Sequence, residues 1–247
     1  MSRRLHAAMN RVLPATLRQG LRDMATAFIP TMRHLDMWVR LQHLAELGVK
    51  FDVIYDIGAA QGAWAQRASK IWPNARIIGF EPNASRVSDL EATRAVLPNF
   101  SYHRCLLGST IADVEYVDSR DQTSLYDRAA AGPKVTAPML TLDSLLGGKE
   151  IPPPSFMKLD VQGYELEILK GGQLALASAQ AVLLEVSVYH LSPEMPLVLD
   201  VLNYMNANGF FWYDILGLLR RPSDDALGQM DLLFLRRDHP LFRDSWE

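Results

Sequence analysis

Residues 51–62, FDVIYDIGAAQG, decide the fold that we expect for this chain. The first seven of them are mainly apolar, which is typical of a buried parallel strand. Gly58 and Gly62 follow in a short turn, and a helical pattern covers residues 63–71. Small residues in such a turn let the backbone approach a ligand closely, and the helix offers free N–H groups. Tight packing of the strand on the helix is the alternative interpretation.

Alternating strand and helix patterns continue along the rest of the chain. We expect further strands over residues 75–80, 100–107, 156–161, 181–188, 210–215 and 231–236, helices over residues 85–97, 165–171 and 197–208, and a hairpin over residues 114–117 and 134–139. This order predicts an α/β fold whose mainly parallel sheet ends in a β-hairpin.

The charge of the chain is divided unevenly along its length. The 247 residues carry a formal net charge of −3, but residues 1–50 hold eight basic and three acidic side chains, which leaves −8 for residues 51–247. We therefore predict a basic helical N-terminal extension over residues 1–50 and a main domain over residues 51–247. The extension is interpreted as an extra helical layer or a self-association surface, with docking to a membrane or a polyanion as the alternative.

Composition excludes several classes of protein. A hydrophobic fraction of 49% and a charged fraction of 21% rule out wholesale disorder, and the net charge gives no nucleic-acid footprint. No apolar run reaches the ~18 residues of a transmembrane helix, and the N-terminus lacks the apolar core of a secretory signal. Because Cys105 is the single cysteine, we expect no disulfide within the chain and a cytoplasmic location.

An acidic residue, Glu81, ends the second predicted strand nineteen positions after Gly62. A carboxylate at this position can accept hydrogen bonds from both hydroxyls of a ribose. The turn before it lacks the glycine spacing of dinucleotide and phosphate loops. A nucleoside without a diphosphate, such as S-adenosylmethionine, therefore fits better than a nicotinamide cofactor, although an ordinary surface glutamate would also explain Glu81.

A third segment, KLDVQGYELEILKGG, covers residues 158–172. Asp160 falls at the carboxyl edge of the predicted sheet, where α/β folds bind their ligands, and Gly163 permits an abrupt turn. Glu165 and Glu167 lie in the first turn of the next helix, where negative charge is favourable. Capping of this helix explains both glutamates equally well.

The segments DIGAAQG, FEPN and KLDVQGYELEILKGG, in this order, resemble the FkbM-type S-adenosylmethionine-dependent methyltransferases over about residues 51–236. The resemblance implies the class I methyltransferase fold, a Rossmann-like seven-stranded sheet with an antiparallel final strand. It also implies O-methylation of a hydroxyl on a sugar, a polysaccharide or a glycosylated natural product. The cofactor-binding residues that it implies are Asp56, Gly58, Ala60, Gln61, Gly62, Glu81, Pro82, Asn83, Leu106, Leu107 and Asp160. The family more often has Glu where Gln162 stands, so we expect no charge role for that side chain.

A sugar hydroxyl is a poor nucleophile at neutral pH, so its methylation benefits from a general base. We predict Asp160, Glu185 and His190 as catalytic candidates near the carboxyl ends of two strands, although His190 is equally well explained as an ordinary loop histidine. The same three residues could instead hold a divalent metal ion such as Mg²⁺. The polar loop over residues 118–126 is a candidate sugar contact or a solvated connector. A cofactor-binding scaffold without turnover is the alternative function.

Overall fold

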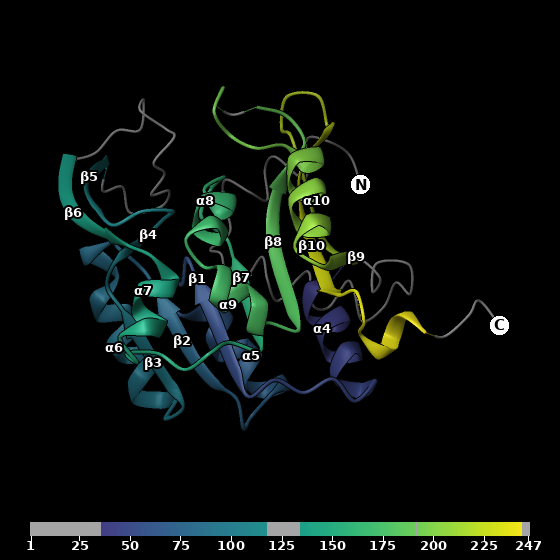
Figure 1. Cartoon of the computed structure of the whole chain (residues 1–247), viewed down its shortest axis with the longest axis horizontal. Helices are drawn as coiled ribbons and strands as arrows, with labels where there is room; N and C mark the ends of the chain where they lie inside the picture. The colour runs from purple at the N-terminus through teal and green to yellow at the C-terminus, as the bar shows by residue number, and fades with distance from the viewer. Residues whose placement is uncertain (1–35, 118–133, 191, 244–247) are drawn as a thin grey trace.

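The computed structural model describes residues 36–117, 134–190 and 192–243 (Figure 1). Residues 1–35 of the predicted basic helical extension lie outside this part of the chain, and so does the polar loop over residues 118–126. Of the predicted N-terminal extension, the structure describes residues 36–50.

A seven-stranded sheet forms the centre of the molecule. Its strands are β1 (Val53–Ile57), β2 (Arg76–Phe80), β3 (Phe100–His103), β7 (Phe156–Leu159), β8 (Ala181–Ser187), β9 (Phe210–Arg220) and β10 (Leu227–Arg236). They lie in the order β3-β2-β1-β7-β8-β10-β9. The first five in this order are parallel, whereas β10 runs antiparallel to both of its neighbours, β8 and β9. The predicted parallel sheet with an antiparallel final strand is confirmed.

Helices cover both faces of this sheet. One face packs against α4 (Met37–Glu46), α5 (Ala63–Ile71) and α6 (Val87–Val96), with a short 3₁₀ turn, η1 (Ala84–Arg86), before α6. The other packs against α7 (Leu142–Gly147), α8 (Glu165–Lys170), α9 (Gln173–Ser178) and α10 (Val198–Ala207), which lie in front of the sheet in Figure 1.

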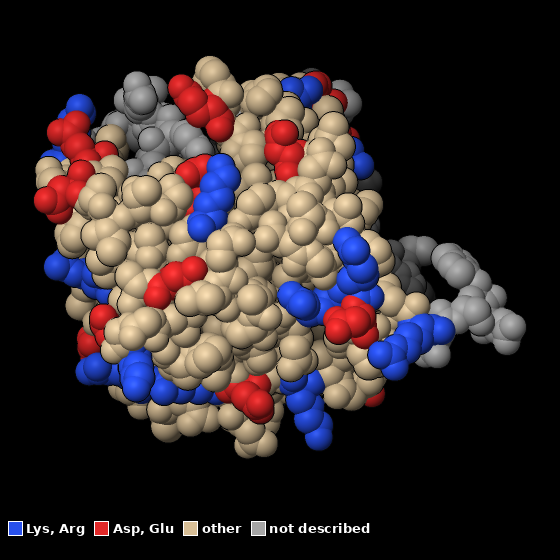
Figure 2. Space-filling view, viewed as in Figure 1, with Lys and Arg blue, Asp and Glu red and all other residues tan. Residues whose placement is uncertain are grey.

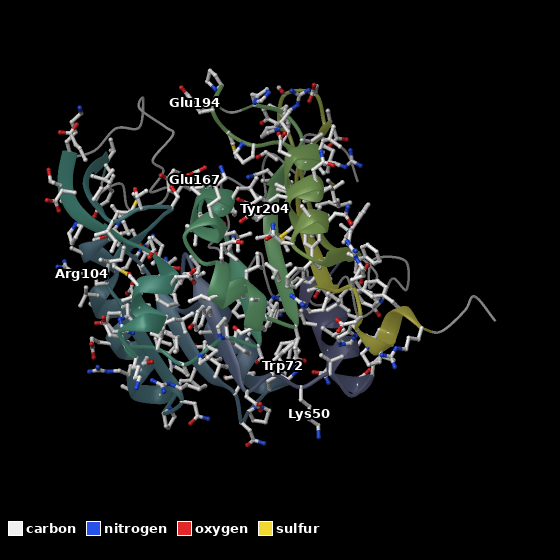
Figure 3. All side chains as sticks on the ribbon, in the orientation of Figure 1. Lys50, Trp72, Arg104, Glu167, Glu194 and Tyr204 are labelled. Atoms are coloured by element: carbon white, nitrogen blue, oxygen red, sulfur yellow. The ribbon has the colours of Figure 1, made fainter. Side chains whose placement is uncertain are left out.

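Alternation along the strands builds these two apolar layers, because successive side chains point to opposite faces. Ile54 and Leu183 belong to the layer under α4–α6, and their neighbours Tyr55 and Leu184 belong to the layer under α7–α10. On the second face, the hydroxyl of Tyr204 on α10 accepts a hydrogen bond of 2.7 Å from Gln173 of α9 (Figure 3).

Helix α4 is part of the packed structure. Asp36 caps it by accepting hydrogen bonds from the backbone N–H groups of Trp38 and Val39. Leu41 and Leu44 on α4 are buried in the apolar layer, and Arg40 forms an ion pair of 2.6 Å with Asp214 on β9. The predicted N-terminal helical layer is therefore present over residues 37–46.

The chain beyond α4 is tied to the end of the sheet away from the carboxyl ends of β1 and β2. There the indole N–H of Trp72 donates a hydrogen bond of 3.1 Å to the carbonyl of Val49, just before β1 (Figure 3). The 3₁₀ turn η2 (Pro240–Phe242) follows β10 near the C-terminus.

Two features of the fold differ from the sequence prediction. The strand predicted over residues 100–107 divides at Arg104 and Cys105, and its second part, β4 (Leu106–Leu107), joins a small separate sheet with β5 (Ala112–Val117) and β6 (Lys134–Leu140). Helices α7 and α9, each six residues long, were not predicted.

On the face shown in Figure 2, basic and acidic side chains are interspersed. None of the described helices combines the length and the apolar character needed to cross a lipid bilayer.

Candidate functional site

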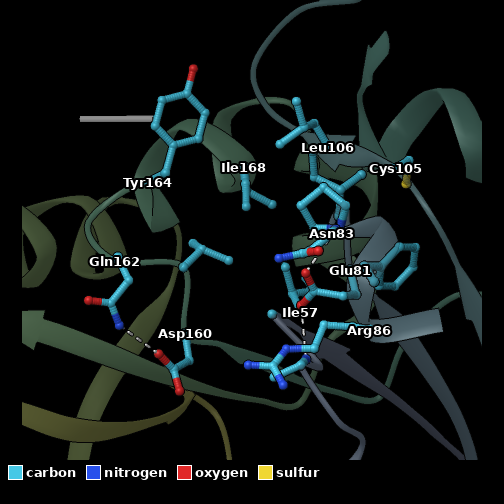
Figure 4. Close-up of a pocket in the computed structure, with 16 residues that line it drawn as sticks. Ile57, Glu81, Asn83, Arg86, Cys105, Leu106, Asp160, Gln162, Tyr164 and Ile168 are labelled. Atoms are coloured by element: carbon cyan, nitrogen blue, oxygen red, sulfur yellow. Dashed lines mark hydrogen bonds between the residues drawn. The ribbon is translucent and has the colours of Figure 1, made fainter. Parts of the chain in front are cut away.

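A cavity of about 230 Å³ lies at the carboxyl ends of β1, β2 and β7 (Figure 4). Eight of the eleven predicted cofactor-binding residues line it: Gly58, Ala60, Glu81, Pro82, Asn83, Leu106, Leu107 and Asp160. The other three lie nearby. Asp56 is buried beneath the turn, Gln61 lines a neighbouring cavity, and Gly62 precedes the first residue of α5. We call this cavity the first cavity.

The turn after β1 can approach β7 because residue 58 is glycine. Gly58 has φ = +76°, and a Cβ atom on it would lie 2.1 Å from the carbonyl oxygen of Asp160. No side chain fits at that distance, so the two loops that carry the predicted cofactor residues are in direct backbone contact. Gly58 and Asp160 thereby form one wall of the first cavity.

Glu81 connects two loops around the first cavity. Its carboxylate accepts hydrogen bonds from the backbone N–H of Ala60, at 2.9 Å, and from that of Asn83, at 3.0 Å. Burial raises the pKa of Glu81, and the two N–H groups oppose that rise. Each carboxylate oxygen retains a second lone pair, so Glu81 can accept further hydrogen bonds from a ligand hydroxyl in the cavity.

A second cavity of about 160 Å³ adjoins the first. The two share Gly58, Ala60 and Asp160 as a common wall. The remaining lining of the second cavity comes from helices α4 and α5, from the turn between β1 and α5, and from strands β7, β8 and β10: Met37, Ala59, Gln61, Ala63, Trp64, Lys158, Leu159, Leu183, Glu185 and Asp231.

A buried ion pair lies under the common wall. The ammonium group of Lys158 is 3.1 Å from the carboxylate of Asp56 and 3.6 Å from that of Asp160, and it donates a hydrogen bond of 3.0 Å to the carbonyl of Gly58. Burial lowers the pKa of Lys158, but the carboxylates of Asp56 and Asp160 outweigh this effect and raise it. Lys158 is therefore a cation that fixes the turn after β1.

Two further carboxyl groups, those of Glu185 and Asp231, line the second cavity. Burial, together with Asp160, Glu165 and Asp231, raises the pKa of Glu185 to about 9, with Lys158 opposing. Burial and Asp160 raise the pKa of Asp231 to about 6. Burial therefore makes both groups weaker acids than usual, Glu185 more so than Asp231.

Comparison with known proteins agrees with this geometry. The profile described as the Methyltransferase FkbM domain matches residues 56–211, which is more than half of the chain. The chain belongs to the FkbM methyltransferase family. The hexuronic acid methyltransferase AglP of Haloferax volcanii is 30% identical over 148 residues, which cover 58% of this chain and 59% of AglP. The chain thus matches about three fifths of the length of that relative.

Two solved structures share the FkbM fold of this chain. The FkbM methyltransferase of Methylobacillus flagellatus KT has 20% identity and a TM-score of 0.50, over 74% of this chain and 43% of that chain. The N-terminal domain of EvdMO1, solved in the presence of SAH and D-fucose, has 11% identity and a TM-score of 0.51. The similarity covers 83% of this chain and 84% of that domain. These similarities establish the fold.

Gln162 bridges two carboxyl groups. Its amide donates hydrogen bonds to Glu185, at 3.2 Å, and to Asp160, at 3.5 Å (Figure 4). A glutamate here would place a third carboxylate between the other two, so the amide suits this acidic surrounding.

Glu165 stabilises the loop after β7, which carries Asp160 and Gln162. It is 3% exposed, and its carboxylate accepts hydrogen bonds from the backbone N–H groups of Val161, at 2.9 Å, and Gly163, at 3.2 Å. Burial raises its pKa to about 7. Glu165 therefore fixes the loop that carries Asp160 and Gln162.

The three predicted catalytic candidates are not brought together. Asp160 and Glu185 line the second cavity, whereas His190 is exposed beyond the end of β8 and lines neither cavity. Among the described residues, no group of three or more His, Cys, Asp and Glu side chains is arranged to hold a metal ion. The alternative of a metal bound by Asp160, Glu185 and His190 therefore has no support in the geometry.

Sequence reasoning missed Lys158, Asp231, Trp64 and Tyr164, which line the two cavities. Lys158 had a signal, because a lysine inside the apolar run FMKL requires a buried anion. Asp231 had none, since its place opposite Glu185 depends on how β10 pairs with β8.

Proposed function

We propose that the chain is an S-adenosylmethionine-dependent O-methyltransferase that acts on a hydroxyl of a sugar or a glycosylated molecule. The observation that carries this proposal is Glu81, a carboxylate held by two backbone N–H groups at the end of β2, with acceptor capacity left toward the first cavity. A carboxylate in this position of a doubly wound sheet suits the two hydroxyls of a ribose.

The residues around the first cavity fit the other parts of S-adenosylmethionine. Leu106, Leu107 and Ile168 offer apolar surface for an adenine ring. Ala60 and Asp160 lie at the other side, on the wall toward the second cavity, where an amino group and a sulfonium would meet a carboxylate. The bound cofactor would supply an electrophilic methyl group, and the chain's own residues would position the acceptor oxygen in line with it.

A sugar acceptor is supported by the relatives. The name of AglP gives hexuronic acid as what that protein methylates, and the EvdMO1 domain was solved in the presence of SAH and D-fucose. A hydroxyl rather than a carboxyl acceptor is our own proposal, and it rests on the carboxyl groups that line the second cavity. Hydroxyl groups can donate hydrogen bonds to such a lining.

Calorimetry with S-adenosylhomocysteine tests the cofactor. The wild-type protein should bind it, and Glu81→Ala should weaken binding by roughly 10- to 100-fold, because a ligand contact and the fixed position of Ala60 are both lost. Glu46→Ala, which removes an exposed glutamate at the end of α4, should bind like the wild type. Absence of binding by the wild type would overturn the proposal. Binding without methylation of any hydroxyl acceptor would favour a cofactor-binding scaffold.

Three further expectations stay predictions. The boundary near residue 50 and self-association through residues 1–50 follow from the charge division of the sequence. The cytoplasmic location rests on a single cysteine, Cys105, whose thiol is buried.

A further inference from the structure

Four adjacent strands carry a row of charged side chains near the carboxyl ends of β1 and β7, above the apolar layer of α4–α6. Asp56 on β1 lies opposite Lys158 on β7, and Glu185 on β8 lies opposite Asp231 on β10. These four positions continue the face to which Ile54, Phe156, Leu183 and Leu233 contribute their buried side chains. The apolar layer thus gives way to a polar row at the carboxyl edge of the sheet, where the second cavity lies.

A glycine on the neighbouring strand leaves space in the sheet for the side chain of Asp231. Gly217 on β9 is its partner, and a Cβ atom on Gly217 would lie 2.1 Å from a carboxylate oxygen of Asp231. The register between β9 and β10 shifts directly after this pair, between Asp231 and Leu232. The carboxylate of Asp231 therefore lies over a strand position that no side chain could share.

Three buried hydrogen-bonding groups near this row of charged side chains have no partner in the described part of the chain. Ser187 lies two residues beyond Glu185 on the same face of β8 and opposite Gln229 on β10. The Ser187 hydroxyl, in a residue that is 2% exposed, and the buried amide nitrogen of Gln229 have no hydrogen-bond partner in the described part of the chain. The indole nitrogen of Trp64, which lines the second cavity, is also buried without a partner there. Buried polar groups normally have partners, so these three point to a polar ligand.

We propose that the second cavity binds an uncharged, hydroxyl-rich ring that reaches the neighbouring pair Ser187 and Gln229, and that Asp231 accepts the proton of the hydroxyl that is methylated. This inference rests on the proposed function and deepens it by naming the acceptor class and the proton acceptor. It places the acceptor next to the proposed cofactor site, beside Gly58, Ala60 and Asp160, the three residues that line both cavities.

The charges of the second cavity favour a neutral ring over a uronic acid. Lys158 is paired with Asp56, so the lining of the second cavity holds no unpaired cation, and the carboxylates of Asp160 and Asp231 set its local charge. A ligand carboxylate would be repelled by the ionised members of this group. Hydroxyl groups can donate to the same oxygens, and the Trp64 ring offers an apolar surface for the C–H face of a sugar ring.

Asp231 is better suited than Glu185 to take the proton. Glu185 already accepts a hydrogen bond of 3.2 Å from Gln162, whereas no hydrogen bond reaches the carboxylate of Asp231 in the described part of the chain. Burial also raises the pKa of Glu185 further than that of Asp231, which agrees with this assignment. Asp160, Glu185 and Lys158 are the other charged groups that line the cavity around Asp231. As the acceptor oxygen bonds to the methyl carbon, the methyl–sulfur bond breaks with its electron pair on sulfur, and the hydroxyl proton passes to the Asp231 carboxylate.

Saturation-transfer NMR tests the acceptor class without requiring turnover. The probes are methyl β-D-galactopyranoside and methyl β-D-glucopyranoside and their two C6-carboxylate counterparts, measured with and without S-adenosylhomocysteine. The neutral glycosides should bind at least about tenfold more tightly than the uronates. In the double variant Glu185→Gln, Asp231→Asn, the ratio between the dissociation constants of the uronates and of the neutral glycosides should be smaller. Equal or tighter binding of the uronates, or binding of no glycoside by a protein that binds S-adenosylhomocysteine, would overturn the inference. Loss of S-adenosylhomocysteine binding itself would instead overturn the proposed function.

Methyl-transfer kinetics on the best neutral glycoside test the proton acceptor. Asp231→Asn should lower kcat by about 100-fold or more at pH 7, because a general base is lost, while binding of S-adenosylhomocysteine is retained. Asp231→Glu should recover part of kcat and shift the lower limb of the pH profile. The matched control is Asp113→Asn, an exposed aspartate on β5. An Asp231→Asn variant with wild-type kcat, or no turnover by the wild type on any bound glycoside, would reject this role for Asp231.

Discussion

The two cavities share one wall but are assembled in different ways. The first is built from short segments, residues 57–60, 80–86, 105–107 and 160–168, each of which supplies several lining groups. The charged lining of the second cavity includes one residue from each of three strands: Lys158 of β7, Glu185 of β8 and Asp231 of β10. Only the pairing of these strands brings the three side chains together. The proposed cofactor side is therefore encoded in local motifs, whereas the proposed acceptor side is encoded in the register of the sheet.

This difference is useful for function. The profile of the FkbM domain ends at residue 211, before Gly217 and Asp231. A sheet can accept new side chains at the ends of its last two strands without altering the turn after β1. We infer that acceptor preference can change within such a framework while the cofactor site is retained.

The largest effect is expected from the ion pair beneath both cavities. Lys158→Met should lower the free energy of unfolding by about 3–5 kcal/mol, because the carboxylate of Asp56 would be left buried without a cation. Adding Asp56→Asn should recover part of the loss. Lys134→Met, which removes an exposed lysine 2.8 Å from Glu115, should cost less than about 1 kcal/mol. Urea denaturation measures all three, and similar losses for the two lysines would contradict the expected difference.

The common wall should be the next most sensitive position. Gly58→Ala should cost about 2–4 kcal/mol and abolish binding of S-adenosylhomocysteine, since the new Cβ collides with the carbonyl of Asp160. Gly48→Ala is the matched control, because Gly48 also has a positive φ, of +89°, but its Cβ would meet nothing within 4 Å. Gly48→Ala should cost only about 1–2 kcal/mol, for backbone strain alone. Thermal melts and calorimetry would refute the collision if both variants behaved alike.

The carboxyl groups of the second cavity should give the stability of the protein a pH dependence. The pKa of Glu185 rises from 4.5 in the unfolded chain to about 9 in the folded protein, so the folded state keeps a proton that the unfolded state loses. Stability from this group is complete below pH 4.5 and is lost as the pH rises through about 9. In Glu185→Gln, the decline in unfolding free energy between these pH values should be shallower. Parallel curves for the two proteins would show that Glu185 is ionised in the folded state.

The smallest stability effect should come from Ser187, whose hydroxyl has no hydrogen-bond partner in the described residues. Ser187→Ala should change the free energy of unfolding by less than about 0.5 kcal/mol, because no intramolecular hydrogen bond is removed. The same variant should weaken binding of the neutral glycosides several-fold in the NMR measurement. A clear loss of stability with unchanged glycoside binding would assign Ser187 to the core rather than to the edge of the second cavity.

The sequence predicted the parts of the fold and site that are local. The turn at Gly58, the carboxylate of Glu81 and the loop at Asp160 are each specified within a few residues, and each lines the first cavity. The extent of β9 to residue 220 and the place of β4 in a separate sheet were not predicted. They depend on pairing with β10 and β6, and a pattern in one strand does not reveal its partner. The proximity of Asp231 to Glu185 escaped prediction for the same reason.

The contact between Gly217 and Asp231 has an evolutionary consequence. Because a Cβ atom at position 217 would displace the carboxylate at position 231 from its place in the sheet, we expect the two positions to vary together. Homologues that keep an acidic residue at the position of Asp231 should keep glycine at that of Gly217, and those that gain a larger residue at 217 should carry a smaller one at 231. In an alignment of sequences, the residues at these two positions would then indicate which branches of the family have kept this acceptor chemistry and which use a different one.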